Sequence, residues 1–173
     1  MSDLYEELLV KRKKKASDSA LKALMIAAIV ISVFAGLFIH PFALLAAIGF
    51  GILAYFKMPA LDLEYEYLYV NGELDVDKIM SKMKRKRVGS FDIDKADLIA
   101  PYKSHELDYY KQNKDLKILD YSSGEENANV YAMITKGEKG LQMVLFEPSQ
   151  SVLNDMRRIA PRKVRRNARV NKL

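Results

Sequence analysis

The sequence predicts an α+β protein in which a two-helix transmembrane hairpin precedes an antiparallel β-domain capped by a C-terminal helix. Three observations predict this fold class. Residues 23–56 form 34 consecutive positions without a charged side chain, although the chain holds 28 Lys and Arg and 22 Asp and Glu. Residues 61–148 then alternate between apolar and polar positions, with turn signals between them. Residues 149–160 finally place apolar side chains at helical spacing.

The N-terminal arm, residues 1–19, combines a small apolar stripe with a basic block. Ser2 or Asp3 is suited to cap a short helix, on which Leu4 and Leu8 would share one face. The arm is then either an interfacial helix on anionic lipid or a solvated leader that sets the membrane orientation. The small size of the stripe favours the solvated leader. The first candidates for contact with a membrane surface are Lys11, Arg12, Lys13, Lys14 and Lys15.

The apolar segment, residues 20–58, is expected to form two helices. One helix over the uncharged run would measure about 50 Å, whereas a bilayer core of about 30 Å is crossed by roughly 20 residues. His40 and Pro41 lie near its middle, and proline disfavours helix at the residue before it. We therefore expect helices at about residues 20–39 and 42–57. The small residues that would let them pack closely are Gly36, Gly49 and Gly51.

A hairpin that crosses the bilayer twice is the favoured interpretation of this segment. The short second helix leaves a re-entrant hairpin open, and a buried soluble hairpin is disfavoured because so small a domain could not cover both helices. Lys and Arg flank the hairpin on both sides, and none lies between the helices. The positive-inside rule then predicts a multi-pass protein of the plasma membrane with both termini in the cytoplasm.

About seven strands in meander-like hairpins are expected after residue 60. The segment LDLEYEYLYV alternates with period two, which is typical of a half-buried strand. Asn71 and Gly72 form the strongest short hairpin turn signal, and ELDVDKIM returns as the partner strand. The later strands are expected in RVGSFDID, ADLIAPY, LKILDYS and the two halves of NVYAMITKGEKGLQMVLFEP.

Two serines are suited to begin helices in this domain, which is expected to span residues 61–160. Ser104 would cap a short helical or irregular insertion that runs to Gln112. Ser149 would cap the closing helix, which Pro161 ends. That helix could cover the mouth and the open edge that two small antiparallel sheets would leave.

Two stretches of this domain resemble a known family. They are EYEYLYVNGELDVDKIMSKMKRKRV and LFEPSQSVLNDMRRIAPRKV. Both resemble bacterial pleckstrin-homology-like (PH-like) domains attached to membrane hairpins, and more narrowly an uncharacterised Firmicutes membrane-protein family. The resemblance covers roughly residues 61–164 and implies a bent barrel of seven antiparallel strands capped by a helix. It implies no activity. Glu73, Asp75 and Asp77 stand where phosphoinositide-binding members carry basic residues, so no phosphoinositide site is expected.

Charge is distributed unevenly over the same region. Residues 58–156 hold 18 acidic and 13 basic residues, whereas residues 157–173 hold eight basic residues and no acidic one. The basic tail, residues 161–173, and a second cluster could dock on an anionic leaflet, or they could be solvated and reinforce the topology. Nucleic-acid binding is disfavoured because no aromatic residues interleave with the tail. The candidates are Lys82, Lys84, Arg85, Lys86, Arg87, Arg162, Lys163, Arg165 and Arg166.

No motif predicts catalysis, a cofactor or a metal site. The chain has no cysteine and only two histidines, which excludes thiol chemistry and a multi-histidine metal site. Ser104, His105 and Glu106 are adjacent, whereas a catalytic triad converges from separate positions. The Asp pairs at residues 75–77 and 92–94 begin no calcium loop. We therefore expect neither an enzyme nor a bound cofactor.

The favoured hypothesis is a non-enzymatic adaptor or scaffold. The hairpin would hold the domain at the inner leaflet, where it binds a protein partner or forms a homo-oligomer. The partner would use an open strand edge or a groove beside the closing helix. The apolar residues of that groove would be Val152, Leu153, Met156 and Ile159. The alternative hypothesis is a sensor or binder of anionic lipid headgroups that acts through the basic clusters.

Overall fold

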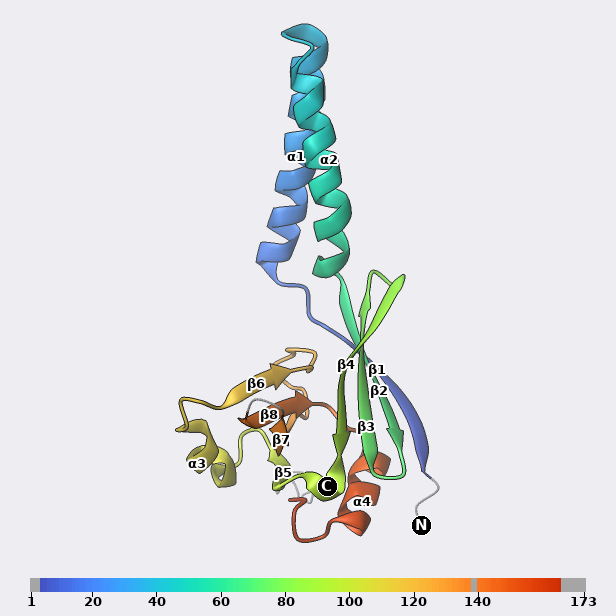
Figure 1. Cartoon of the computed structure of the whole chain (residues 1–173), viewed down its shortest axis with the longest axis vertical. Coiled ribbons are helices and arrows are strands. Elements are labelled where there is room, and N and C mark those ends of the chain that lie inside the picture. Colours follow the sequence, from blue (N-terminus) through green and yellow to red (C-terminus); the bar gives the residue numbers. More distant parts are fainter. Residues whose placement is uncertain (1–3, 138–139, 166–173) are drawn as a thin grey trace. The chain divides into compact units, whose positions relative to one another are not determined.

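The computed structural model describes residues 4–137 and 140–165, and Figure 1 shows their elements. These residues form two compact units. The first unit, called here the domain unit, comprises residues 4–12, 65–78 and 85–165. The second unit, the helical unit, comprises Lys13–Glu64 and Ile79–Lys84. The fold is α+β: two long apolar helices, two sheets of four strands each and a C-terminal helix.

Two apolar helices form most of the helical unit, as the proline break predicts. Helix α1 spans Ala16–Phe38 and helix α2 spans Ala43–Lys57, and a short 3-10 helix, η1, follows at Met58–Leu61. Both helices, with η1 counted in the second, are long and apolar enough to cross a membrane. Only 11% of the 18-residue apolar stretch of the first helix is buried, and only 6% of that of the second. Apolar side chains are therefore exposed around the pair.

The two helices approach each other closely at Gly36. A β-carbon added to Gly36 would lie 2.6 Å from both Cγ and Cδ2 of Leu44 on α2. The buried residues of α2 are also small, namely Ala47 and Ala54. Gly49 and Gly51 have no neighbouring atom within 4 Å of an added β-carbon, so their expected role in close packing is wrong.

The first sheet has the strand order β1-β2-β3-β4. Its strands are β1 (Tyr5–Lys11), β2 (Leu63–Val70), β3 (Glu73–Met80) and β4 (Lys84–Asp92). The turn between β2 and β3 is the one that the sequence predicts, and Asn71 and Gly72 adopt φ values of 49° and 89°. The tyrosines Tyr65, Tyr67 and Tyr69 of β2 are buried on one face, as their spacing indicates.

Strand β1 stands where the sequence analysis expected a short helix. Leu4, Leu8 and Val10 face the core, whereas Tyr5 and Leu9 are exposed, which is the period-two pattern of a strand. Residues four apart share a face in both a helix and a strand, so Leu4 and Leu8 alone do not distinguish the two. The helix caps proposed at Ser2 and Asp3 lie outside the described residues.

The second sheet has the order β5-β7-β8-β6. Its strands are β5 (Leu98–Pro101), β6 (Lys117–Asp120), β7 (Tyr131–Gly137) and β8 (Gly140–Phe146). Strand β7 pairs antiparallel with β5 and β8, but β6 pairs parallel with β8. The expectation of purely antiparallel strands is therefore wrong. The ten residues 121–130 replace a tight turn between β6 and β7, which lets β6 lie on the far side of β8.

The eight strands of the described residues form two separate sheets, so the expected bent barrel of about seven strands is also wrong. The chain bends from β4 to β5 through a 3-10 turn, η2 (Ile93–Lys95), instead of continuing the ladder. The backbone of residues 163–165 occupies the edge of β5. Ile99 donates its N–H to the Lys163 carbonyl at 2.8 Å and accepts one from Arg165 at 2.8 Å. In the described residues this edge is thus satisfied by the C-terminal segment, not by β4.

Helix α4 (Gln150–Ile159) closes the core of the domain unit. Ser149 caps it as predicted, since its Oγ accepts a hydrogen bond from the Val152 N–H at 3.1 Å. The core beneath it joins tyrosines of β2 with Phe146, Met156 and Val164. Because β1 and Val164 contribute to this core, the domain extends beyond the expected limits of residues 61 and 160 at both ends.

The insertion after β5 covers the other face of the second sheet. It contains η3 (His105–Leu107) and α3 (Asp108–Lys111), and Ser104 accepts a hydrogen bond from the Glu106 N–H at 3.3 Å. Leu107 is fully buried there, in a second apolar cluster with Ala132, Ile134 and Met143. This insertion therefore packs against the second sheet and covers that face.

We predict that a large side chain at Gly36 separates α1 from α2. Gly36→Leu would overlap Leu44 and should lower the free energy of unfolding by about 1–3 kcal/mol. Gly49→Leu is the matched control, since open space surrounds that position. Unfolding of the full chain in detergent measures both variants. Equal effects in the two variants would contradict the close contact.

We also predict that the domain unit unfolds at alkaline pH through its buried tyrosines. Burial is the main cause that raises the pKa of Tyr65, Tyr67, Tyr69 and Tyr121 above the ordinary value of 10.0. The unfolded chain then loses these protons first, so the stabilisation is complete below pH 10 and is lost as the pH rises further. Each such tyrosine should remove about 1.4 kcal/mol per pH unit in that range.

Urea unfolding above pH 10.0, followed together with tyrosinate absorbance, measures this slope. Tyr67→Phe should make the slope shallower, because it removes one of the buried groups. Tyr109→Phe is the control, since the Tyr109 side chain is 82% exposed. A wild-type slope in the Tyr67→Phe variant would show that its burial does not control alkaline unfolding.

Candidate functional site

Basic side chains gather at the end of the helical unit where α1 begins and α2 ends. We call this set the basic collar. The segment that follows α2 contacts two other parts of the collar region. The Asp62 carboxylate lies 3.9 Å from the Lys14 ammonium, and the Asp62 backbone carbonyl accepts a hydrogen bond from the Ser81 N–H at 2.8 Å. The opposite end of the helix pair, around His40, has no Lys or Arg. The collar consists of Lys13, Lys14, Lys15, Lys57, Lys82 and Lys84.

Three consecutive side chains at the β3–β4 turn are exposed to solvent, namely Lys82, Met83 and Lys84. Ser81 and Lys82 adopt φ values of 48° and 57°, in the left-handed region. Met83 follows and is 87% exposed. The Lys84 ammonium lies 6.0 Å from the ring centroid of Tyr55, near the end of α2. The sequence analysis grouped Lys82 and Lys84 with their neighbours but missed Met83 between them.

Two of the basic candidates, Arg85 and Arg87, bind carboxylates of their own sheet. Arg85 pairs with Glu66 and with Asp77, whose Oδ2 lies 2.9 Å from the arginine Nε. Arg87 lies 3.0 Å from Asp75 and 3.5 Å from Asp77. Asp75 and Asp77 lie two residues apart on β3, and the cations that they hold are these two guanidinium groups. Both guanidinium groups are therefore engaged within the sheet.

The N-terminal candidates run from Lys11, the last residue of β1, to Lys15, which directly precedes α1. Lys11 is exposed, and Arg12 is half-buried. Burial raises the pKa of Tyr65, and the positive charge of Arg12 partly opposes that rise. The Lys15 N–H donates to Asp18 at 3.3 Å, which ties the start of α1 to the basic block.

The first C-terminal candidates contact other residues of the domain unit. Arg165 forms an ion pair with Glu106 at 2.7 Å, and the Lys163 ammonium donates to the Asp94 carbonyl at 2.5 Å. Arg162 is exposed, and Arg166 lies outside the described residues. Lys86 on β4 is also exposed. Lys163 and Arg165 of the expected basic tail thus contact the domain.

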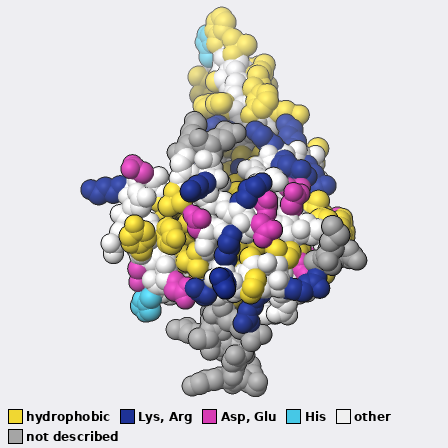
Figure 2. All heavy atoms as spheres, turned by 60° about the horizontal axis from the view of Figure 1, so that its bottom comes forward, with side chains coloured by type: hydrophobic (Ala, Val, Ile, Leu, Met, Phe, Trp, Pro, Cys, Tyr) yellow, Lys and Arg dark blue, Asp and Glu magenta, His cyan; other side chains and the backbone are white. Residues whose placement is uncertain are grey.

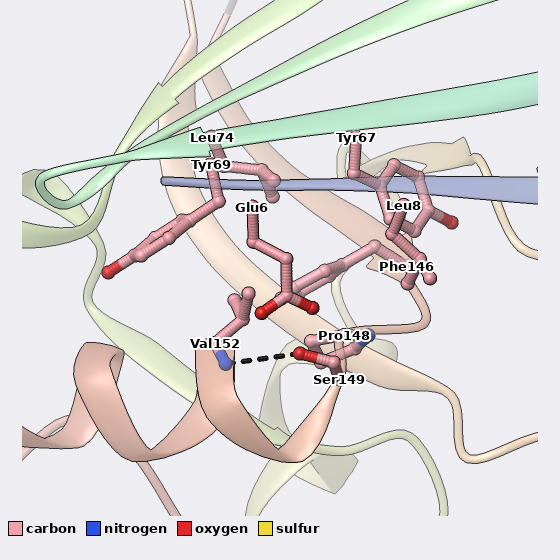
Figure 3. A pocket seen from close by; sticks show the side chains of 9 residues that line it. All are labelled: Glu6, Leu8, Tyr67, Tyr69, Leu74, Phe146, Pro148, Ser149 and Val152. Atoms are coloured by element: carbon pink, nitrogen blue, oxygen red, sulfur yellow. Dashed lines mark hydrogen bonds between the residues drawn. The ribbon is translucent and has the colours of Figure 1, made fainter. Parts of the chain in front are cut away.

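The proposed partner groove is mostly core. Val152, Leu153 and Met156 are buried against the sheets, and Ile159 packs its Cδ1 toward Gly72. A small apolar pocket does open beside α4, and only Val152 of the four candidates lines it (Figure 3). Glu6 is its charged member and accepts a hydrogen bond from Ser151. The other lining residues are Leu8, Tyr67, Tyr69, Leu74, Phe146, Pro148 and Ser149.

The polar groups of the remaining motifs form local contacts. Asp92 caps η2 by accepting the Asp94 N–H at 2.9 Å, and its hydrogen bond with Lys95 is the main cause that lowers the pKa of Asp92. His105 lies 3.1 Å from Asp108 on the exposed insertion. Among the described residues, no group of three or more His, Cys, Asp or Glu could hold a metal ion.

The face of the molecule that Figure 2 shows divides by chemistry. Side chains of the helix pair are predominantly hydrophobic in the face that Figure 2 shows, whereas Lys, Arg, Asp and Glu are interspersed elsewhere on that face. The candidate functional surface is therefore the junction of these two chemistries within the helical unit, which is the basic collar.

Comparison with known proteins identifies a family. Residues 2–166 match the family described as Bacterial PH-like domain (DUF6106), and no curated protein matches the chain. The matched range includes β1 and both apolar helices as well as the two sheets. It is wider than the resemblance drawn from the sequence, which began at residue 61, and it agrees with the place of β1 in the first sheet. The chain therefore belongs to the bacterial PH-like domain family DUF6106.

Proposed function

We propose that this protein is a non-enzymatic adaptor or scaffold of the plasma membrane. In this proposal α1 and α2 cross the bilayer twice, and the PH-like domain lies on the cytoplasmic side. There the domain binds a protein partner or a second copy of the chain.

The observation that carries the proposal is the position of the helix pair between two neighbouring strands. β1 precedes α1, β2 follows α2, and the two strands are adjacent in one sheet. A single crossing would place these strands on opposite sides of a membrane. An even number of crossings returns the chain to the side of the membrane on which it started, and two helices provide two crossings. A cleaved signal sequence fits poorly, because cleavage would separate β1 and its buried Val10 from the domain.

The exposure of the helices supports a lipid environment. Bulky side chains such as Ile31, Phe38 and Leu45 are more than half exposed in the single chain. Leaving such a side chain in water forgoes about 1.5–3 kcal/mol relative to burial. Lipid tails cover these side chains without a partner protein. The small residues at the contact, Gly36 and Ala47, are typical of helix packing in membranes.

The basic collar supports the orientation. Its lysines flank the end of the pair at which both helices meet the rest of the chain, and residues 23–56 contain no Lys or Arg. Under the positive-inside rule that end faces the cytoplasm.

The edge of β1 supports a binding role for the domain. β1 is the terminal strand of its sheet, and no further strand pairs with it in the described part of the chain. Tyr5 and Leu9 are exposed on it, at 61% and 55%. Unpaired N–H and C=O groups beside exposed apolar residues accept an added strand from a partner. We place the partner there.

We predict that the two ends of the hairpin label differently in intact cells. The chain has no cysteine, so His40→Cys and Lys114→Cys each provide one labelling site. A membrane-impermeant maleimide should label the His40→Cys variant from outside. The Lys114→Cys variant should react only after permeabilisation. Labelling of Lys114→Cys in intact cells would overturn the orientation, and protection of His40→Cys would support a re-entrant hairpin instead.

We also predict that a charge on the β1 edge weakens partner binding. Leu9→Lys should reduce crosslinked product in native membranes by about tenfold, the effect of roughly 1.4 kcal/mol in binding. Ile118→Lys, at an equally exposed position on β6, is the matched control. Two differently tagged copies report self-association, and mass spectrometry reports another protein. Unchanged crosslinking in Leu9→Lys would exclude this edge.

A further inference from the structure

We propose that the β3–β4 turn is a third contact with the membrane, besides α1 and α2. In this contact Met83 enters the interfacial layer of the bilayer, and Lys82 and Lys84 bind the phosphate groups of anionic phospholipids. The inference rests on the proposed function, because it requires the helix pair to lie in a bilayer.

The composition of the turn fits this role. Met83 is 87% exposed, and each neighbour in the chain is a lysine. An apolar tip between two flexible ammonium groups matches a surface whose outer layer is anionic and whose interior is apolar. A protein partner is less suitable, because Lys is depleted from the buried centre of protein interfaces.

The backbone conformation of the turn supports a functional role for these side chains. The β2–β3 turn uses Asn71 and Gly72, the residues that adopt positive φ most readily. The β3–β4 turn places Ser81 and Lys82 in the same left-handed region, at φ values of 48° and 57°. A lysine with its long side chain is an uncommon residue there, and such outliers concentrate at functional positions.

The turn is fixed at the level where α2 ends. Ile79–Lys84 belong to the same compact unit as the helices. The Ser81 N–H donates to the Asp62 carbonyl at 2.8 Å, one residue beyond η1, and the Lys84 ammonium lies 6.0 Å from the ring centroid of Tyr55. If Tyr55 lies in the aromatic belt of the bilayer, Lys84 lies among the headgroups. The three contacts would then restrict rotation of the β3–β4 hairpin about the membrane normal.

Fluorescence of single-cysteine variants of the full chain in lipid nanodiscs tests the proposal. Met83→Cys carries an environment-sensitive label, in discs of phosphatidylcholine alone or mixed with phosphatidylglycerol. Ile31→Cys on α1 reports insertion of the helices, and Tyr109→Cys reports a water-exposed position of the domain. In discs with phosphatidylglycerol, we expect the Met83→Cys label to emit at shorter wavelength and to be several-fold less accessible to iodide than the Tyr109→Cys label. Introducing Lys82→Glu and Lys84→Glu into Met83→Cys should abolish this shielding, whereas an affinity of the label itself would survive.

The outcomes separate this inference from the proposed function. Shielding at Ile31→Cys without shielding at Met83→Cys would overturn the third contact and leave the anchor intact. A water-exposed label at Ile31→Cys would overturn both. Equal shielding of Met83→Cys in the two lipid mixtures would overturn the assignment of anionic phosphates as the ligand of Lys82 and Lys84.

Discussion

The pairing of β1 with β2 is the constraint on which the rest of the structure depends. These neighbouring strands are separated in sequence by the whole helix pair, yet Val10 of β1 and Tyr67 of β2 belong to one core. The entropy cost of closing a long insertion grows only slowly with its length, and a hairpin whose two ends lie together reduces it further. The core therefore cannot be completed until the chain has passed through both helices. Folding of the domain and placement of the helices are thus coupled through one strand pair.

The same sheet separates its basic residues by type. Arg85 and Arg87 meet Glu66, Asp75 and Asp77 on one sheet face, where a planar guanidinium can bridge two carboxylates. The lysines of the β3–β4 turn instead remain in solvent, which suits a strongly hydrated ammonium on a flexible stem. A run that reads in sequence as one basic cluster therefore supplies both an internal ion-pair network and an outward-facing surface. The positive charge of the two arginines is offset by neighbouring carboxylates, whereas no ion pair with a carboxylate is recorded for Lys82 or Lys84 in the described residues.

Signals confined to a few neighbouring residues were predictable, and pairings between distant segments were not. The Pro41 break, the Asn71 and Gly72 turn and the Ser149 cap each act through local backbone geometry, and each stands in the structure as the sequence indicates. Strand β1 was missed because Leu4 and Leu8 fit either periodicity until β2 supplies a partner. The parallel β6, the open sheets and the docking of Val164 beside Ile99 depend on which edges meet. For the candidate site, lysines and arginines were identifiable by type, but their division between ion pairs and solvent required the positions of Asp75 and Asp77.

The buried polar side chains give a reason to seek function on the surface. The Tyr69 hydroxyl donates to Asp155 at 2.9 Å, and Arg158 donates to the other carboxylate oxygen at 2.9 Å. The Tyr67 hydroxyl donates to the Tyr121 carbonyl at 2.6 Å. These bonds satisfy groups that would otherwise be costly to bury, and they join β2 to α4 and to the segment after β6. Because the bonds are used to hold the two sheets and the helix together, the same groups are poorly placed to receive a ligand. Recognition is then best sought where the described surface combines exposed apolar and unpaired polar groups, at the β1 edge and at the β3–β4 turn.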